Sequence, residues 1–415
     1  MAMHTLYICY FGLREPLVQT QVLPYLRQLM RDGVEVTLLT FEPELAHART
    51  KQELEQAKAK LEAEGIHWEA LRYHKRPSLP ATLYDIAAGA RLAARLVRTR
   101  NITLIHARNH VAAAMALRVK RIAGGRFLFD IRGFMPEEYV DAGIWPAGGY
   151  LFRLTKTAER RLLAAADGFV VLTEKAREIL FPGISDTDAL GRPVEVIPCC
   201  VDLDRFRAAA LLARDDTRRE LNLTDRRVFV YVGALGGWYL TEEMAEFLAL
   251  AHSQDPRTFS LILTQSPPEM ITERLSRLGI AESDYRVLKV APSEIPRYLK
   301  AADVALSFIK PCFSKLASSP TKIAEYLAGG LPVISNAGIG DLDELLDTDR
   351  VGVLVREFNR DAYLNALSAV DELQSDGSLA ERCRESARNR FDLEGVGGAR
   401  YRRIYRRLNN EAQGR

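Results

Sequence analysis

A repeated alternation between short apolar runs and longer segments with helical spacing is the feature that most constrains the fold of this chain. Short runs that are apolar throughout and rich in β-branched residues are typical of parallel strands that helices cover on both faces. In the first half of the chain we expect such strands at 6–10, 34–40, 66–71, 102–107, 126–131, 168–173 and 194–198. Helical spacing is found between them at 18–33, 83–98, 110–124 and 150–166. The pattern predicts a doubly wound α/β domain, whose first helix starts late or kinks at Pro24.

A second series of the same kind follows the first. Its expected strands are 228–235, 259–265, 285–290, 303–309, 332–335 and 351–355. A chain of 415 residues also suits two domains better than one core. We therefore predict an α/β protein of two doubly wound Rossmann-like domains that face a central cleft, with ligands at the carboxyl ends of the strands.

The domain boundaries follow from the connector between the two series, IPCCVDLDRF at 197–206. We expect a first domain at 1–200 and a second domain at 201–385. The last segment, 386–415, is helical and rich in arginine, and we expect it to pack back on the first domain.

Composition and charge narrow the classes of protein. A hydrophobic content of 47% is ordinary for a soluble protein, and a net charge of +3 does not indicate a nucleic-acid partner. Basic residues are clustered at 91–100, 118–126 and 400–408, which are either solvated helix faces or contacts with anionic lipid head groups. There is no run of 18 apolar residues and no signal-peptide pattern, so we expect a cytoplasmic protein that can touch a membrane surface without crossing it.

The five cysteines lack C-x-x-C spacing and predict neither a disulfide framework nor a zinc site. We expect free thiols in a reducing compartment. The adjacent pair Cys199 and Cys200 is poorly placed for a relaxed disulfide, so a structural role is expected for both.

A glycine-rich turn follows the first strand of the second series, in VFVYVGALGGWYLTEEM at 228–244. Gly233, Gly236 and Gly237 would let backbone N–H groups approach a phosphate, and the amino end of the next helix would add favourable partial charge. The alternative is that these glycines only make the turn.

The stretch SSPTKIAEYLAGGLPVIS at 318–335 predicts a short helix that carries a lysine and a glutamate on one side. Ser318 or Ser319 would cap this helix, and the glycine pair at 329–330 would end it. A diphosphate at its amino end, near Ser318, Ser319 and Thr321, would meet free N–H groups and the ammonium of Lys322. One turn deeper, Glu325 would accept hydrogen bonds from a ribose diol. The alternative for Lys322 and Glu325 is a solvated ion pair.

Four motifs resemble those of one enzyme family. PTKIAEYLAGGLPVIS at 320–335 resembles the nucleotide-binding signature of family 4 glycosyltransferases, which are retaining enzymes of the GT-B fold. IPCCVDLDRF and the closing FDLEGVGGARYRRIYRRL are similar to the connector and last helix of that family. FDIRGFMPEEYVDAGIW at 129–145 resembles the D-x-R-G-F-x-x-E-x-V-D-x-G segment of a bacterial subgroup. The resemblance implies a sugar nucleotide held by the second domain and an acceptor held by the first.

The chain departs from the family pattern at three places. Ala317 replaces the first acid of Glu-x7-Glu, which usually contacts the donor sugar, and GLREPLVQTQ at 12–21 replaces a Gly-Gly loop. GALGGWYL lacks the usual Arg and Lys, so Lys315 and Lys322 are expected to meet the diphosphate charge, with Arg132 closing over it from the first domain.

The resemblance implies a chemistry in which the diphosphate leaves and the acceptor hydroxyl attacks the same face of the sugar. Catalysis is then mainly stabilisation of the leaving group by cations and helix ends, without a metal or other cofactor. We expect Asp130, Arg132 and Lys322 to be catalytic, with Asp130 orienting a sugar hydroxyl and Arg132 pairing with phosphate. A structural Asp–Arg turn pair is the alternative for the first two.

Other residues near these segments receive weaker assignments. His106 and His110 are expected to be structural. Glu137, Glu138 and Asp141 are expected in a mobile acceptor loop, and Trp238 and Tyr239 would line the cleft or merely pack.

These observations lead to the hypothesis of a retaining, metal-independent hexosyltransferase. Its donor would be a nucleotide sugar, and we expect a UDP-sugar. Its acceptor would be a carbohydrate or a lipid-linked molecule in bacterial polysaccharide, glycolipid or glycoconjugate synthesis. The alternatives are a GT-B epimerase that acts on the sugar nucleotide and a catalytically inactive nucleotide-binding partner protein.

Overall fold

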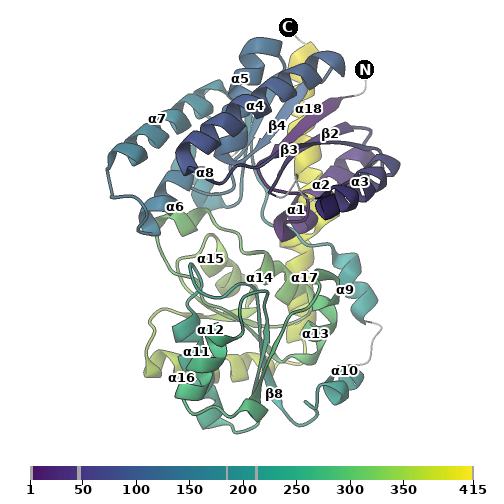
Figure 1. Cartoon of the computed structure of the whole chain (residues 1–415). Coiled ribbons are helices and arrows are strands. Elements are labelled where there is room, and N and C mark those ends of the chain that lie inside the picture. Colours follow the sequence, from purple (N-terminus) through teal and green to yellow (C-terminus); the bar gives the residue numbers. More distant parts are fainter. Residues whose placement is uncertain (1–2, 44–47, 184–185, 211–213, 414–415) are drawn as a thin grey trace. The chain divides into compact units, whose positions relative to one another are not determined.

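The computed structural model describes residues 3–43, 48–183, 186–210 and 214–413. Contacts divide the chain into unit 1, Met1–Ile197 with Gly397–Arg415, and unit 2, Pro198–Val396 (Figure 1). The division falls at the start of the expected connector. The segment expected as one C-terminal piece, 386–415, is shared between the units, because only the part from Gly397 belongs to unit 1.

Unit 1 contains a parallel sheet with seven strands among its described residues, in the order β3-β2-β1-β4-β5-β6-β7. The strands are β1 His4–Cys9, β2 Glu35–Glu42, β3 Ile66–Arg72, β4 Leu104–Arg108, β5 Arg126–Asp130, β6 Gly168–Val171 and β7 Val194–Val196. Strands β1, β4 and β6 are buried at every position, as expected of strands with helices on both faces.

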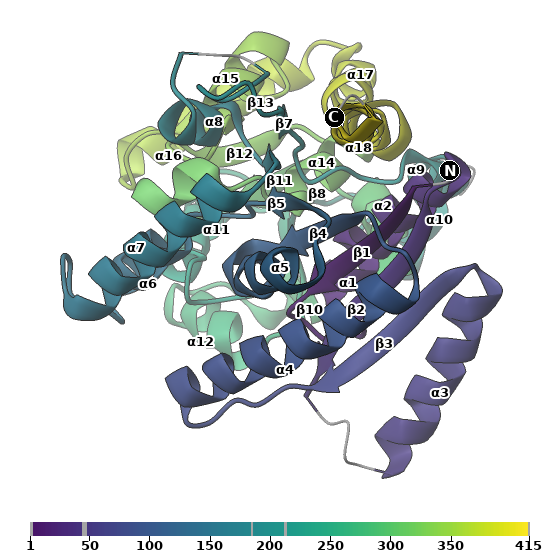
Figure 2. The ribbon, with the colours of Figure 1, turned by 90° about the horizontal axis from the view of Figure 1, so that it is seen from above.

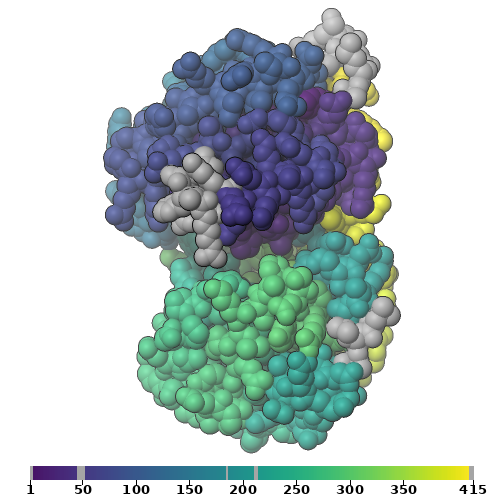
Figure 3. Space-filling model, turned by 45° about the vertical axis from the view of Figure 1, so that its right-hand side comes forward, coloured from purple at the N-terminus to yellow at the C-terminus, as the bar shows by residue number. Residues whose placement is uncertain are grey.

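Helices cover both faces of this sheet. They are α1 Pro16–Gln21, α2 Leu23–Arg31, α3 Ala48–Ala63, α4 Ser78–Thr99, α5 Asn109–Ala123, α6 Met135–Asp141, α7 Tyr150–Ala165, α8 Glu174–Leu180 and α18 Ala399–Gln413. Figure 2 shows α4, α5 and α7 on one face and α2, α3 and α18 on the other. The C-terminal segment lies beside N-terminal residues at the surface (Figure 3), where Arg402 Nη1 is 3.2 Å from Asp32 Oδ2.

Unit 2 has a second parallel sheet, with six strands in its described part and the order β10-β9-β8-β11-β12-β13. The strands are β8 Arg227–Val232, β9 Thr258–Leu263, β10 Tyr285–Leu288, β11 Val304–Ser307, β12 Val333–Asn336 and β13 Gly352–Val355. Two hydrophobic cores lie on its two faces, one under α11, α12 and α16 and the other under α13, α14, α15 and α17.

The remaining elements of unit 2 are helical. The α-helices are α9 Leu203–Ala210, α10 Arg214–Glu220, α11 Thr241–Gln254, α12 Glu269–Arg277, α13 Ile295–Ala301, α14 Thr321–Ala328, α15 Leu342–Asp349, α16 Arg360–Gln374 and α17 Leu379–Phe391. The short turns are η1 Glu282–Asp284, η2 Pro292–Glu294, η3 Phe313–Ala317 and the π-helical η4 Leu393–Gly398.

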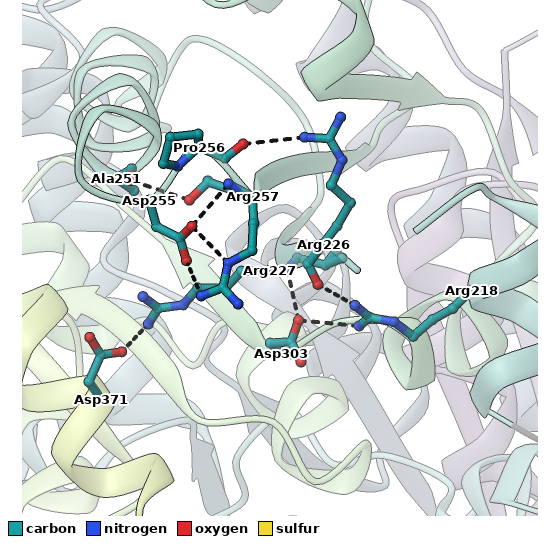
Figure 4. A network of polar contacts seen from close by, with 11 residues as sticks. Arg218, Arg226, Arg227, Ala251, Asp255, Pro256, Arg257, Asp303 and Asp371 are labelled. Carbon is teal, nitrogen blue, oxygen red and sulfur yellow. Dashed lines mark hydrogen bonds and ion pairs between the residues drawn. The ribbon is translucent and has the colours of Figure 1, made fainter. Parts of the chain in front are cut away.

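An arginine–aspartate network occupies the amino edge of the unit 2 sheet (Figure 4). Asp303, just before β11, accepts a hydrogen bond from the backbone N–H of Val228 at 2.7 Å and one from Arg218 Nη1 at 3.2 Å. Arg218 also donates to the carbonyl of Ala301 at 2.9 Å. Arg227 pairs with Asp371, which ties the start of β8 to α16.

The expected strands are all present, with small shifts at their ends. The break at Pro24 is also confirmed, because α1 ends at Gln21 and α2 starts at Leu23. The expected mobile loop around Glu137, Glu138 and Asp141 is wrong: these residues form α6, with Pro136 in its first turn. Its acidic side chains suit the amino end of a helix, which the polar composition concealed.

Two further expectations are settled by the described residues. All five cysteines are free, and Cys199 and Cys200 are buried. None of the described helices combines the length and the apolar character that crossing a membrane requires.

Candidate functional site

The candidate site of unit 2 lies where the strand order of its sheet reverses. Strands β8 and β11 are neighbours there, although β8 is followed by β9 in the chain. The loops that leave their carboxyl ends are joined, since Lys310 N–H donates to the carbonyl of Trp238 at 2.8 Å and Leu240 N–H to that of Phe308 at 3.2 Å. Open α/β sheets bind their ligands at this kind of position.

Lys322, on the first turn of α14, reaches this position. Its side chain is buried, with 7% of the residue exposed. Its Nζ lies 4.1 Å from the ring centroid of Tyr231 and 4.2 Å from that of Tyr239, and it makes no hydrogen bond to any residue that the structure describes. Gly233 allows this approach, because a Cβ there would lie 2.9 Å from Nζ. Lys322 is therefore a buried cation between two aromatic rings, without an anionic partner.

Glu325 lies one turn further along α14 and is equally buried, with 6% exposed. The alternative of a solvated ion pair is excluded, because α14 is buried at every position from Lys322 to Ala328 and no ion pair joins Lys322 to Glu325 in the described part of the chain. The charged group near Glu325 is Arg205, whose Nη1 is 3.8 Å from Oε1.

Burial shifts both ionisable groups toward neutrality. It lowers the pKa of the Lys322 ammonium to about 7, with only a partial opposing effect from the charge of Glu325. It raises the pKa of the Glu325 carboxyl to about 7, against the opposing charges of Arg205 and Lys322. An anion and a hydrogen-bond donor arriving at this site would stabilise the charged forms of both.

The amino end of α14 is built differently from expectation. The cap residue is Pro320, without a side-chain cap, so Ser318 and Ser319 do not cap the helix. Ser319 Oγ instead accepts a hydrogen bond from Cys199 N–H at 3.1 Å, and Ser318 N–H donates to the carbonyl of Lys315. The helix begins at Thr321, so its first N–H groups have no intrahelical acceptor.

The glycine-rich turn after β8 is largely occupied by its own contacts. Gly233, Gly236 and Gly237 have φ of 141°, 72° and 62°, which explains the residue type. Leu235 N–H donates to Ser266 Oγ at 3.0 Å and Gly236 N–H to Thr241 Oγ1 at 2.8 Å. Two of the donors that a phosphate cradle would use are thus satisfied, which favours the interpretation of a turn.

A second lysine of this edge, Lys315 on η3, is also held by an aromatic ring. Its Nζ lies 3.8 Å from the ring centroid of Trp238, and its carbonyl accepts a hydrogen bond from Gly340 N–H at 2.9 Å. Trp238 and Tyr239 therefore contact one lysine each.

Sequence reasoning missed two partners in this site, Tyr231 and Arg205. A phenol within the otherwise apolar strand FVYV was the available signal for Tyr231. Nothing in the connector singled out Arg205.

Asp130 of unit 1 is the centre of a second buried cluster, at the carboxyl end of β5. Its Oδ2 accepts a hydrogen bond from the Tyr401 hydroxyl at 3.2 Å and lies 3.5 Å from His106 Nε2. Arg108 and Arg132 place one Nη1 each 3.6 and 3.5 Å from the carboxylate. Burial alone would raise the pKa of Asp130, but Arg132, His106 and Arg108 together hold it well below its ordinary value.

This geometry favours the structural alternative for Asp130. Asp130 is wholly buried and acts as the counter-ion of Arg108 and Arg132, although its Oδ1 makes no hydrogen bond within the described part of the chain. His106 is tied to the same cluster, since its Nδ1 lies 2.8 Å from the Tyr405 hydroxyl.

His110 belongs to a separate set of contacts that fastens helices together. Its Nε2 lies 3.0 Å from Glu159 Oε1 on α7. Lys156 pairs with Glu159 and, at 2.9 Å, with Glu137 Oε1 on α6. These contacts connect α5, α7 and α6 and give His110 the structural role that was expected.

Two family models match most of the chain. Residues 18–205 match the model of Glycosyltransferase Family 4, and residues 226–371 match that of Glycosyl transferases group 1. A comparison with curated proteins finds no match.

Solved structures of similar fold cover nearly the whole chain. A glycosyltransferase from Rickettsia africae has a TM-score of 0.70 and 14% identity, over 98% of both chains. Anabaena HepE in complex with UDP and glucose has a TM-score of 0.69 and 16% identity, over 98% of this chain and 100% of that one. A sucrose-phosphate synthase from Thermosynechococcus elongatus has a TM-score of 0.73 and 17% identity, over 99% and 100%. With both domain models in this order on two parallel-sheet Rossmann-like units, the chain is a glycosyltransferase of the GT-B fold with family 4 and group 1 domains.

Proposed function

We propose that this protein is a retaining hexosyltransferase that uses a UDP-sugar donor and needs no metal ion. Unit 2 binds the nucleotide sugar, and unit 1 binds a carbohydrate or lipid-linked acceptor of bacterial polysaccharide, glycolipid or glycoconjugate synthesis. The observation that carries the proposal is Lys322, a buried ammonium without an anionic partner at the strand reversal of unit 2.

The charge of Lys322 suits the diphosphate of the donor. An isolated buried cation is unfavourable, and an oxyanion within hydrogen-bond distance would remove that penalty. The N–H groups in the first turn of α14 point out of the amino end of the helix, where they favour negative charge. Glu325, one turn deeper and buried, is placed to accept hydrogen bonds from the two ribose hydroxyls.

The proposal of uracil and of a hexose is supported by a protein of similar fold. Anabaena HepE was solved with UDP and glucose, at 16% identity to this chain.

In the proposed reaction the bond between the anomeric carbon and the diphosphate oxygen breaks. The acceptor oxygen forms a bond to the same carbon on the same face, and its proton passes to the departing diphosphate. Lys322 and the amino end of α14 stabilise the charge that develops on the leaving group. Lys315 would add a second positive charge near the leaving group, because it lies on η3, which follows β11 at the same edge of the sheet.

We also propose a cytoplasmic protein with peripheral contact to the inner membrane. Of the basic runs, 400–408 uses part of its charge within unit 1, since Arg403 pairs with Glu195 and Arg400 donates to the Val196 carbonyl. Exposed arginines remain on α4 and α5. Exposed apolar side chains are found just before α7 and in its first turns, namely Ile144, Tyr150, Leu151 and Leu154. Flotation with vesicles that contain an anionic lipid, compared with vesicles of neutral lipid alone, tests this contact.

The test of the function is nucleotide binding followed by turnover. UDP, GDP, ADP and dTDP are titrated by calorimetry into the wild-type chain and into Lys322→Met, without added metal and with a chelator. We expect UDP to bind most tightly and the variant to lose that binding. A panel of UDP-hexoses is then assayed for release of UDP with candidate acceptors; binding of no nucleotide would contradict the proposal.

A second function is favoured by one residue. Ala317 occupies the position of the acid that usually contacts the donor sugar, and it is buried in η3. A chain that binds UDP tightly but releases none from any UDP-sugar, and that becomes active only with a partner enzyme, would be a nucleotide-binding partner protein. A sugar nucleotide whose mass is unchanged but whose sugar is converted would identify an epimerase.

A further inference from the structure

We propose that His74 of unit 1, oriented by the buried carboxylate of Asp85, binds a hydroxyl group of a sugar ring on the acceptor, and that Tyr84 packs against the same ring. The binding site is inferred from the contacts of unit 1 alone. Only the assignment of the sugar to the acceptor rests on the proposed function, which gives the donor to unit 2.

His74 lies at the carboxyl edge of the unit 1 sheet. It follows the end of β3 by two residues, and Tyr73 before it is tied to the end of β2, because Tyr73 N–H donates to the Glu42 carbonyl at 3.0 Å. Asp85, on α4, contacts Tyr10, which directly follows β1. The carboxyl ends of parallel strands are the place at which open α/β sheets bind their ligands.

Asp85 is a buried carboxylate with three hydrogen-bond donors. Its Oδ2 accepts from the Tyr10 hydroxyl at 2.7 Å and from the His74 backbone N–H at 3.0 Å, and its Oδ1 lies 2.6 Å from His74 Nδ1. Burial and the hydrogen bond to Asp85 raise the pKa of Tyr10 above its ordinary value, so the phenol keeps its hydrogen and stays a donor. A carboxylate can only accept, and Nδ1 of His74 therefore carries a hydrogen.

The other ring nitrogen of His74 is open. In a neutral imidazole with its hydrogen on Nδ1, Nε2 has a lone pair and accepts a hydrogen bond. Nε2 of His74 makes no hydrogen bond to any residue that the structure describes, and 35% of the side chain is exposed, against 1% of that of Asp85. The carboxylate thus fixes the ring and its tautomer and leaves an accessible acceptor.

No other histidine in the described part of the chain has this arrangement. Each of the others is buried, has contacts at both ring nitrogens, or pairs with a carboxylate that is itself partly exposed. These are His4, His67, His106, His110 and His252. A histidine that acts on a ligand is commonly oriented by a hydrogen bond at its second nitrogen, which is the arrangement of His74.

An exposed aromatic ring lies beside this acceptor. The ring centroids of Tyr84 and His74 are 5.1 Å apart, and the two rings are almost perpendicular, at 88°. Tyr84 is 62% exposed, and its neighbour Leu83 is 51% exposed. A sugar ring has C–H groups on its faces and hydroxyl groups around its rim, so it can pack on an aromatic ring and donate a hydrogen bond beside it.

The lone pair of Nε2 favours a hydroxyl over an oxyanion. An ionised phosphate or carboxylate oxygen has no hydrogen to donate, so its lone pairs would face that of Nε2. A hydroxyl group donates one hydrogen and needs no countercharge. A fixed acceptor next to an exposed aromatic ring therefore indicates a neutral sugar as the part of the acceptor that binds here.

The first measurement is the tautomer of His74, by nitrogen-15 NMR of the full-length chain labelled at histidine. His74→Asn identifies its signals. At pH 8, where free imidazole is neutral, we expect a hydrogen at Nδ1 and none at Nε2. Asp85 acts through His74 and is a positioning residue, so Asp85→Asn, whose amide can also donate, should give both tautomers. A hydrogen fixed at Nε2 in the wild type, or an unchanged tautomer in Asp85→Asn, would overturn the inference.

Ligand probes are then added to the labelled protein. They are the methyl glycosides of glucose, galactose and mannose, with acetate and inorganic phosphate as anionic probes. We expect at least one glycoside to shift the Nε2 signal of His74 and the anions to leave it in place. A shift with none of the glycosides, or with the anions alone, would contradict a sugar site.

Variants measure how much each group contributes to binding of that glycoside, by calorimetry. His74→Asn keeps a donor to Asp85, because its amide nitrogen can take the place of Nδ1, but it lacks Nε2. Its affinity should be about 5- to 10-fold lower, as expected for one lost hydrogen bond, while its melting temperature stays near that of the wild type. Tyr84→Leu should lower affinity about threefold. His67→Asn is the matched control, and losses equal to those of His74→Asn would refute the site.

UDP titrations distinguish failure of this inference from failure of the proposed function. Wild-type protein that binds no UDP would refute the function, while glycoside binding that depends on His74 would still establish the unit 1 site. We expect glycoside binding to persist in Lys322→Met and UDP binding to persist in His74→Asn. Loss of glycoside binding in Lys322→Met would assign the sugar to unit 2 and overturn the inference.

Discussion

The two edges of the unit 2 sheet differ in how their buried charged side chains are paired. At the amino edge, Arg218 and Asp303 are hydrogen-bonded to each other and to backbone groups (Figure 4). At the carboxyl edge, Lys322 has two aromatic rings but no acceptor among the described residues. A buried ion pair whose hydrogen bonds are all made holds strands in place, whereas a buried cation without an anion can bind an anionic ligand. We therefore expect the function of unit 2 at the edge of its sheet where a buried charge has no partner.

The largest effect is expected from breaking the paired edge. Asp303→Ala leaves Arg218 buried without its carboxylate and the Val228 N–H without its acceptor. We expect a loss of about 3 kcal/mol in the free energy of unfolding, measured by urea denaturation. UDP affinity of the folded protein should be unchanged, because the site lies at the other edge.

The control for this variant is Asp204→Ala in the same unit. Asp204 pairs with Arg207 on α9, and both side chains are largely exposed. Its loss should change the free energy of unfolding by less than about 0.5 kcal/mol. Equal effects of the two substitutions would show that the network of the amino edge does not hold the sheet.

The second largest effect is expected at the carboxyl edge of the sheet, where a substitution should weaken UDP binding without lowering stability. Lys322→Met removes a buried charge and keeps the side chain apolar and of similar length. We expect unchanged or increased stability of the ligand-free protein, and UDP affinity about 100-fold lower, because a charged hydrogen bond to phosphate is lost. Calorimetry with UDP and urea denaturation without it measure both; a destabilised variant with normal affinity would reverse the assignment of the two edges.

The sequence predicted the sheets more completely than the site. Strands buried on both faces appear as apolar runs regardless of their partners, so both sheets could be located from local pattern alone. Glu137 and Glu138 misled the interpretation of α6, because acidic residues are as common in loops as in first turns of helices.

The site depends on residues that a local pattern cannot bring together. The sequence placed Lys322 and Glu325 together on one short helix, but it gave no sign of the rings that cover Lys322, because these belong to β8 and the loop after it. The cluster around Asp130 was not predicted either, because it joins Arg108 from β4 and Tyr401 from the end of the chain to β5.

A smaller effect is expected from pH. Burial lowers the pKa of Lys322 to about 7 in the free protein, and a bound diphosphate should raise it again. UDP binding above pH 7 then takes up a proton, so affinity should fall by up to tenfold for each pH unit between 7 and 9. The phosphate groups contribute no opposing change there, because their last pKa is about 6.

Glu325 affects the pH dependence of UDP affinity in the opposite direction, so the test uses a variant that lacks this carboxylate. Its pKa is raised to about 7, and its ionised form is the better acceptor for ribose, so its contribution to affinity rises with pH. Glu325→Gln should therefore show a steeper fall in UDP affinity with pH than the wild type. A flat profile in this variant would mean that Lys322 does not gain a proton when UDP binds.

The smallest effect is expected from the aromatic rings that contact Lys322. Tyr239→Leu removes one cation–π contact, worth about 1 kcal/mol, so the pKa of Lys322 should fall by less than one pH unit and the decline in UDP affinity should start at lower pH. Tyr231→Phe keeps its ring and loses only the hydrogen bond to the Ala234 carbonyl, so the profile should not move although stability falls by about 1 kcal/mol. Both variants are compared in the Glu325→Gln background by calorimetry from pH 6 to 9. Equal midpoints in both would show that the rings merely fill space, and the carboxyl edge would then hold a cation with no stabilising contact at all until the nucleotide arrives.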